Sequence, residues 1–203
     1  MILLCKLGLT LVVLVVVGAA IAMAMLVYQG VSARDQPTTL EAFVARRLRH
    51  LAVPRSARQA RNPVPATPDV LAEARAHFAD HCASCHGNDG SGQTEMGQHL
   101  YPKTPDMRQA DTQALSDGEL FYIIHNGVRL TGMPAWGDST PEEDQDSWKL
   151  VHFIRHLPKV SPAELEEMKK LNPRSPQEME EEQEEEQFLQ GEDSPPSSPH
   201  HHH

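Results

Sequence analysis

The sequence predicts an all-α protein in which one long apolar helix precedes a small helical domain. Residues 7–27 are apolar and carry no charged side chain, which indicates a helix long enough for a membrane. Residues 67–158 contain three runs of apolar residues at helical spacing, and each run follows a Ser or Thr that suits a helix N-cap. The length of 203 residues suits one or two domains.

The first element is predicted to be a transmembrane anchor over residues 1–30. As a helix, its apolar stretch would span about 30 Å, the thickness of the hydrocarbon core of a bilayer. The apolar core of a cleaved signal peptide is shorter, at about 7–15 residues. Small residues within the stretch leave cleavage as the alternative: Ala20, Ala22 and Ala24.

Residues 31–66 are predicted to form a basic juxtamembrane segment that ends in a proline-rich linker. Thr38 and Glu41 make a capping-box pattern. Apolar residues with interleaved arginines follow at roughly helical spacing: Leu40, Phe43, Val44 and Leu48. The pattern predicts a short amphipathic helix. Two settings remain open for it, namely anionic lipid and a protein surface on the next domain or on a partner subunit.

Residues 67–158 are predicted to form one compact domain of three helices. The helices are expected to start after Thr67, Ser116 and Thr140, and the last one to end at Pro158. Three short helices supply little apolar core, and only 5% of the chain is aromatic. A domain this small needs an additional stabilising group, or staple, such as a bound cofactor.

Residues 159–203 are predicted to form an acidic, largely disordered tail after a short helix that starts at Ser161. Six of the seven residues from Glu180 to Glu186 are glutamates, and such a run stays solvated. The closing His200–His203 is interpreted as a tag remnant or a native tail, with a weak metal site as the alternative.

The formal net charge of −10 is unevenly distributed along the chain. Residues 1–66 carry a net charge of +6, whereas residues 67–158 and 159–203 carry −8 each. The acidic body predicts no nucleic-acid partner, because nucleic-acid binding needs clustered Lys and Arg. It suits partners that present a basic face.

The chemistry centres on Cys82, Cys85 and His86, which form a Cys-x-x-Cys-His motif. Two thiols at this spacing reach the two vinyl groups of one haem and form thioethers, and the next imidazole faces the iron. A thioredoxin-like redox motif would need a βαβ setting, which is not visible, and a zinc site would need further ligands. One covalent haem c is therefore the predicted cofactor, and it is the staple that completes the core.

Met133 is the predicted sixth ligand of the iron, opposite His86. It is flanked by Gly and Pro on a tight loop, 47 positions after His86, so the chain can wrap around the haem edge. Met107 is the reserve candidate, and His99 and His125 are the further alternatives.

Taken together, the motifs of residues 67–158 resemble those of a class I cytochrome c. The resemblance lies in the order helix, Cys-x-x-Cys-His-Gly, loop, short helix ending in Asn-Gly, Gly-Met-Pro-Ala and terminal helix. It implies the small class I cytochrome c fold around one haem, with the first and last domain helices crossing at Phe78 and Trp148. It also implies a proline carbonyl, from Pro102 or Pro105, on the Nδ1 hydrogen of the proximal histidine.

His/Met ligation raises the reduction potential and closes the iron to substrate. The predicted function is therefore that of a single-electron carrier, not an enzyme. It would shuttle electrons between membrane redox complexes of a respiratory chain, or exchange them with another electron-transfer protein. Alternatively, it would serve as a haem subunit of such a complex. One alternative is a haem enzyme, a peroxidase or an oxidoreductase for a small inorganic substrate, with an exchangeable sixth ligand. Another is a structural or sensory haem module.

The predicted location is the membrane, with the haem domain on the extracytoplasmic, periplasmic side. The resemblance to c-type cytochromes implies this side, because their haem is attached outside the cytoplasm. The distribution of positive charge disagrees: Lys6 precedes the span and several arginines follow it, which would place the domain in the cytoplasm. The prediction follows the haem motif.

Overall fold

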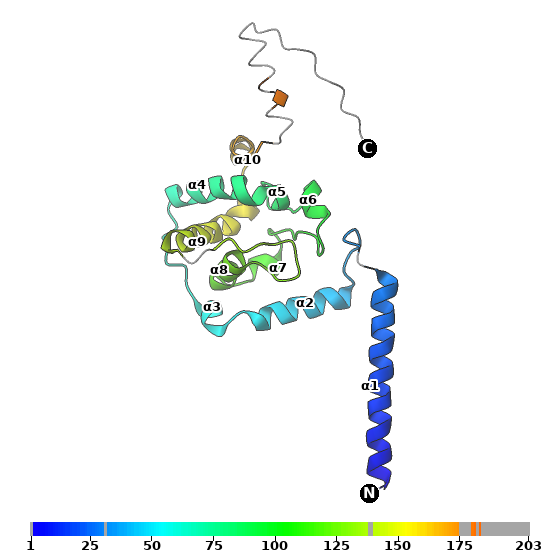
Figure 1. Ribbon diagram of the computed structural model, residues 1–203. Helices are drawn as coiled ribbons and strands as arrows, with labels where there is room; N and C mark the ends of the chain where they lie inside the picture. The colour runs from blue at the N-terminus through cyan, green and yellow to red at the C-terminus, as the bar shows by residue number, and fades with distance from the viewer. Residues whose placement is uncertain (1, 31, 138–139, 175–179, 182, 184–203) are drawn as a thin grey trace.

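The computed structural model describes residues 2–30, 32–137, 140–174, 180–181 and 183, and these contain helices but no β-strand (Figure 1). The predicted all-α class is confirmed for this part of the chain. Most of the predicted disordered tail, including His200–His203, lies outside the described residues.

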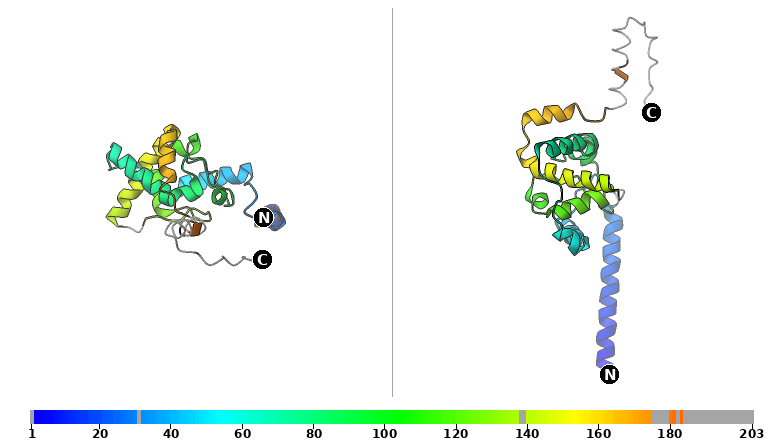
Figure 2. Two further views of the ribbon diagram at one scale, coloured as in Figure 1. Left: turned by 90° about the horizontal axis from the view of Figure 1, so that it is seen from above. Right: turned by 90° about the vertical axis from the view of Figure 1, so that its left-hand side faces the viewer.

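Helix α1 (Ile2–Gln29) coincides with the predicted anchor. Its segment Lys6–Met25 is long and apolar enough to cross a bilayer, and none of it is buried against the rest of the protein. Figures 1 and 2 show α1 as a single rod that projects from the helical domain, with its N-terminus at the far end.

The core of the domain lies between α4 (Pro68–His77), α8 (Asp117–Asn126) and α9 (Pro141–His156). Both α4 and α8 pack on α9, which confirms that the first and last domain helices meet. Phe78, directly after α4, packs against Phe153 of α9 with ring centroids 4.9 Å apart.

Trp148, the second residue predicted at this crossing, makes its aromatic contact with α8. It stacks on Phe121 of α8, with ring centroids 4.2 Å apart and planes 11° from parallel. Trp148 and Phe153 are five residues apart on α9, so their side chains point about 140° apart around the helix axis. One therefore faces α8 while the other faces the α4 side.

Capping boxes start three helices where the sequence predicts them. Thr38, Ser116 and Ser161 each accept a hydrogen bond from the amide of the third helical residue, and the glutamate side chain there accepts one from the backbone amide of the cap residue. They begin α2 (Thr39–Ala52), α8 and α10 (Pro162–Lys169).

The hydrophobic core includes residues on both sides of 67–158. Met168 of α10 is fully buried in it. Arg75 of α4 pairs with Glu164 at 3.3 Å and with Glu167 at 2.7 Å, and these ion pairs fasten α10 to α4. Further short elements are α3 (Arg55–Gln59), α6 (Glu95–Gln98), α7 (Ala110–Gln113) and η2 (Leu157–Lys159).

The segment before the domain packs along it, and we call residues 38–64 the strap. Helix α2 contacts the domain through polar side chains, because Arg46 pairs with Asp111 at 3.1 Å and His50 Nδ1 lies 2.9 Å from Glu119 Oε1. Further bonds hold the rest of the strap: Ser116 Oγ to Arg58 O, Asn62 Nδ2 to Trp148 O, and His152 Nε2 to Val64 O. The polar face of the amphipathic helix therefore packs on the domain, which is one of the two settings left open for it.

Replacing Gly118 with alanine is expected to loosen the strap. A Cβ built on Gly118 would overlap the backbone carbonyl oxygen of Ala57 in α3. In a helix that touches nothing, the same change would stabilise the protein by about 1 kcal/mol. Overpacking here should instead destabilise it by about 1–3 kcal/mol. The readouts are a lower Tm and faster proteolysis within the strap.

The control is Gly18→Ala in α1, because no heavy atom lies within 4 Å of a Cβ built there. It should leave the proteolysis pattern of the strap unchanged. A higher Tm for Gly118→Ala, with an equally resistant strap, would contradict the close approach of α3 to α8.

Candidate haem-binding site

The two motif cysteines lie on one continuous helical segment. Helix α4 runs without a break into the π-helical turn η1 (Phe78–Cys82) and then into α5 (Ala83–His86). Cys82 closes the π-turn and Cys85 follows one turn later, so both thiols lie on the same side of the segment. Cys82 and Cys85 do not form a disulfide with each other, and both are half-buried.

Burial, reinforced by the neighbouring Cys85, raises the pKa of the Cys82 thiol to about 12. Cys82 is therefore protonated near neutral pH. The reactive cysteine of a thioredoxin-like motif has a depressed pKa, so this environment disfavours that alternative.

His86 presents a neutral ring to the site. Burial lowers its pKa to about 4, which leaves a ring nitrogen lone pair free to bind a metal near neutral pH. Its Nδ1 atom is buried and has no hydrogen-bond partner. A buried polar atom without a partner is costly, and such atoms gather at sites that bind a further group. The residues present therefore fit a haem.

The predicted hydrogen bond from His86 Nδ1 to a proline carbonyl, of Pro102 or Pro105, is not formed. The segment that carries Pro105 packs on Gly92 instead. A Cβ built on Gly92 would lie 2.5 Å from Thr104 O and 3.2 Å from Pro105 O. Pro105 thus lies beside the backbone that follows the motif, and neither proline carbonyl accepts a hydrogen bond from His86 Nδ1.

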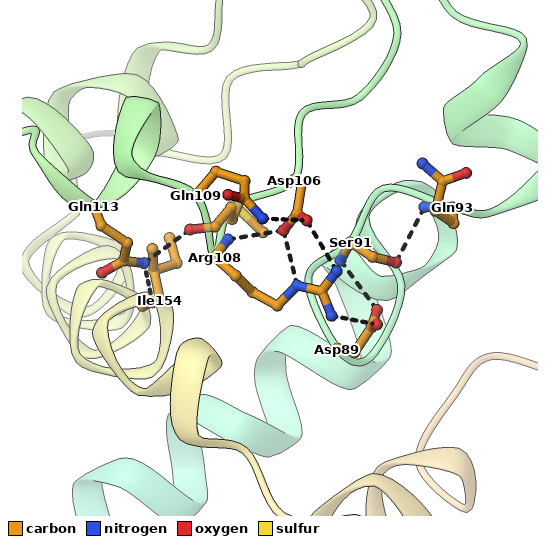
Figure 3. Close-up of polar contacts among 9 residues, drawn as sticks. Asp89, Ser91, Gln93, Asp106, Arg108, Gln109, Gln113 and Ile154 are labelled. Atoms are coloured by element: carbon orange, nitrogen blue, oxygen red, sulfur yellow. Dashed lines mark hydrogen bonds and ion pairs between the residues drawn. The ribbon is translucent and has the colours of Figure 1, made fainter.

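Arg108 ties the loop after the motif to the segment that faces it (Figure 3). Its guanidinium donates to Asp106 at 2.8 and 2.9 Å and to Asp89, three residues after His86, at 3.0 Å. These hydrogen bonds from Arg108 hold the pKa of Asp106 well below its usual range. Met107, the reserve ligand candidate, is buried in the core beside them.

Met133 lies on a loop that folds back onto the end of α8. Gly127 ends α8 with φ of +66°, and a Cβ there would lie 2.6 Å from the carbonyl carbon of Pro134. The amide of Val128 donates to Met133 O at 3.1 Å, and the amide of Met133 donates to Thr131 Oγ1 at 3.1 Å. The backbone around Met133 is therefore held on both sides, as the sequence predicts for a stiff loop.

Residues next to the predicted ligands connect the two halves of the site. Trp136, three residues after Met133, meets His81 edge-on with ring centroids 5.6 Å apart, and His81 directly precedes Cys82. Leu100 packs on Gly132, where a Cβ would lie 2.6 Å from Leu100 Cδ2. The fold therefore brings the Met133 loop to the helical segment that carries the cysteines.

Sequence reasoning missed Leu100 and Arg108. Leu100 acts through Gly132, and Arg108 joins its near neighbour Asp106 to Asp89, which lies 19 positions away, so neither contact follows from a local pattern. The two histidine alternatives for the sixth ligand have contacts elsewhere. His125 stacks on Phe121 at 5.3 Å, and His99 Nδ1 lies 2.7 Å from Glu95 O.

Comparison with known proteins places the similarity on this part of the chain. Residues 69–154 match the family model for cytochrome c oxidase, cbb3-type, subunit III. The Cbb3-type cytochrome c oxidase subunit FixP of Rhizobium meliloti is 34% identical over 98 residues, which is 46% of this chain and 29% of that protein. The chain thus spans less than a third of the length of the curated relative it matches. The family match contains Cys82, Cys85, His86 and Met133.

Proposed function

Residues 69–154 form a c-type cytochrome domain, and from that premise we propose that the chain is a single-electron carrier with one covalent haem c. Cys82 and Cys85 would hold the haem as thioethers, and His86 and Met133 would bind its iron. When bound, the haem supplies a one-electron ferric/ferrous couple. The residues of the chain attach it, orient it and tune its potential.

The observation that carries the proposal is that two ligand-bearing segments are held by the fold and linked to each other. His86 closes a helical segment with a neutral ring, and Met133 lies on a loop pinned to α8. Two fixed ligands leave no position on the iron for a substrate, so the haem-enzyme alternative is not favoured. The Met thioether favours ferrous iron and gives a higher potential than two nitrogen ligands would.

The proposed setting is a membrane redox complex. The matched relative is by name a subunit of a cytochrome c oxidase. We propose that this chain delivers electrons within or to such a complex, or to another electron-transfer protein. Helix α1 anchors the chain in the bilayer, and the haem domain lies on the extracytoplasmic side, where haem is attached to this motif in c-type cytochromes.

Electron transfer to a basic partner is expected to slow as salt rises. Residues 67–158 carry a net charge of −8, so long-range attraction should speed encounter at low ionic strength. Salt screens this attraction over about 8–10 Å. We expect the second-order rate constant, measured by stopped flow, to fall about tenfold between low and physiological salt.

The glutamate-rich tail is a second source of negative charge that could attract a basic partner. A chain that ends at Pro173 removes it and keeps α10, whose Met168 is part of the core. The shortened chain should retain most of the salt dependence, and an uncharged small-molecule oxidant should show none. Rates that do not depend on salt in either chain would remove charge steering from the proposed function.

A further inference from the structure

Helix α2 turns its apolar face away from its own domain. Four large apolar side chains share one face of the helix and expose 71%, 44%, 60% and 71% of their surface: Leu40, Val44, Leu48 and Leu51. We call this the apolar stripe. The residues that contact the domain, Arg46, His50 and Val53, lie on the opposite face. A surface helix ordinarily does the reverse and buries its apolar face.

The surroundings of the apolar stripe match a lipid interface. Phe43 extends it at one edge, with the guanidinium of Arg47 5.3 Å from the ring centroid. Arginines along such a helix can reach phosphate headgroups while the apolar side chains enter the acyl region. A continuous exposed apolar face on a soluble surface marks an interaction site.

The position of α2 relative to α1 identifies the occupant. In Figures 1 and 2, α2 runs crosswise beside the C-terminal end of α1, and the domain lies on the side of α2 away from the N-terminus of α1. The apolar stripe therefore faces the side on which α1 extends. If α1 spans a bilayer, the stripe meets the surface of that same bilayer.

Charge supports a lipid occupant as well. The domain carries a net charge of −8 and would be repelled by anionic headgroups, whereas residues 1–66 carry +6. Helix α2 places the basic part of the chain between the acidic domain and the membrane. The acidic domain is thereby kept above the headgroups.

We propose that α2 lies in the membrane interface with its apolar stripe among the lipid acyl chains. The ion pair Arg46–Asp111 and the hydrogen bond between His50 and Glu119 then hold the cytochrome domain on α2 at a fixed orientation above the bilayer. The domain is not tethered by a loose linker but docked on a membrane-embedded helix. This inference rests on the proposed span of α1 and is independent of the haem ligands.

The test places nitroxide labels in the full-length, haem-loaded chain, reconstituted singly in nanodiscs of phosphatidylethanolamine and phosphatidylglycerol. In a Cys5→Ala background, labels are attached at Val44→Cys or Leu48→Cys. Power saturation compares collisions with oxygen, which enters lipid, and with a water-soluble nickel chelate. We expect an oxygen-to-nickel ratio at least about fivefold higher at these positions than at Lys169→Cys in α10, across the domain from α2 (Figure 1).

Each outcome decides the inference. A label at Val13→Cys in α1 reports the span itself. If Val13 is in lipid but Leu48 collides with the nickel chelate, the span stands and the inference fails. If Leu48 is shielded from both reagents, another part of the same chain covers the apolar stripe and the inference fails. If Val13 is in water, the span and the inference both fail.

A charged variant separates lipid contact from packing within the chain. Leu48→Glu should leave Tm and the haem spectrum unchanged, because Leu48 faces away from the domain. It should lower the oxygen-to-nickel ratio of a label at Val44. A loss of stability as large as that expected for Gly118→Ala would show that the apolar stripe packs on protein, and would overturn the inference.

Discussion

Replacing both Cys82 and Cys85 with alanine is expected to abolish covalent haem attachment and to leave the cytochrome domain largely unfolded. Cys82 packs against the hydrophobic core cluster, so a haem attached there would add its apolar surface to the core. Domains of this size are stable by only about 5–15 kcal/mol, and loss of a tightly bound group removes a large part of that. Haem should stay with the wild-type chain in acidified acetone and leave the variant.

Circular dichroism of the variant should show loss of most helical signal outside α1. The matched control is Cys5→Ala, which removes a thiol of α1 and should keep both haem and fold. A haem-free double variant that unfolds cooperatively at the wild-type Tm would show that the haem is not needed as a staple. Covalent haem retained without either thiol would contradict the attachment itself.

Replacing Met133 with alanine is expected to open the iron and lower its reduction potential. The ferric form should lose its sulfur-to-iron charge-transfer band, and the ferrous form should bind carbon monoxide, which the wild type should not. Because the thioether favours ferrous iron, the potential should fall by roughly a tenth of a volt or more, within the range of about 0.8 V that axial ligands set. Potentiometric titration and carbon monoxide spectra measure both effects.

Met133→His should restore six-coordination at a low potential, provided that the loop pinned to α8 admits the ring. The matched control is Met107→Leu, which keeps the volume of a buried core side chain and should cost under about 1.5 kcal/mol. Its spectrum should be that of the wild type. If Met107→Leu removes the charge-transfer band and Met133→Ala does not, Met107 is the ligand. Carbon monoxide binding by the wild type would favour the haem enzyme instead.

Helix starts and the haem motif could be predicted because the forces behind them are local. Thr38, Ser116 and Ser161 cap helices through hydrogen bonds that reach three residues along the chain. The spacing of Cys82 and Cys85 places two thiols on one side of a helical turn whatever the rest of the chain does.

Other features depend on contacts between distant residues, and sequence reasoning missed or misplaced them. Trp148 was expected at the helix crossing, but the rotation of α9 turns it toward Phe121. The proline segment was expected at the ring of His86, but it packs on the backbone of Gly92. Met168 was placed in a mainly disordered tail, and it is fully buried in the core.

By itself, the sequence determined the long apolar helix, the helical class, the spacing of the Cys-x-x-Cys-His motif and the stiff loop around Met133. Each of these features depends only on side chains that lie a few residues apart in the chain. Only the tertiary structure decided which way the amphipathic helix faces. Periodicity defines an apolar face, but the polar contacts of His50 with Glu119 and of Arg46 with Asp111 turn that face away from the domain. Such pairs join residues more than 60 positions apart, so no local pattern encodes them.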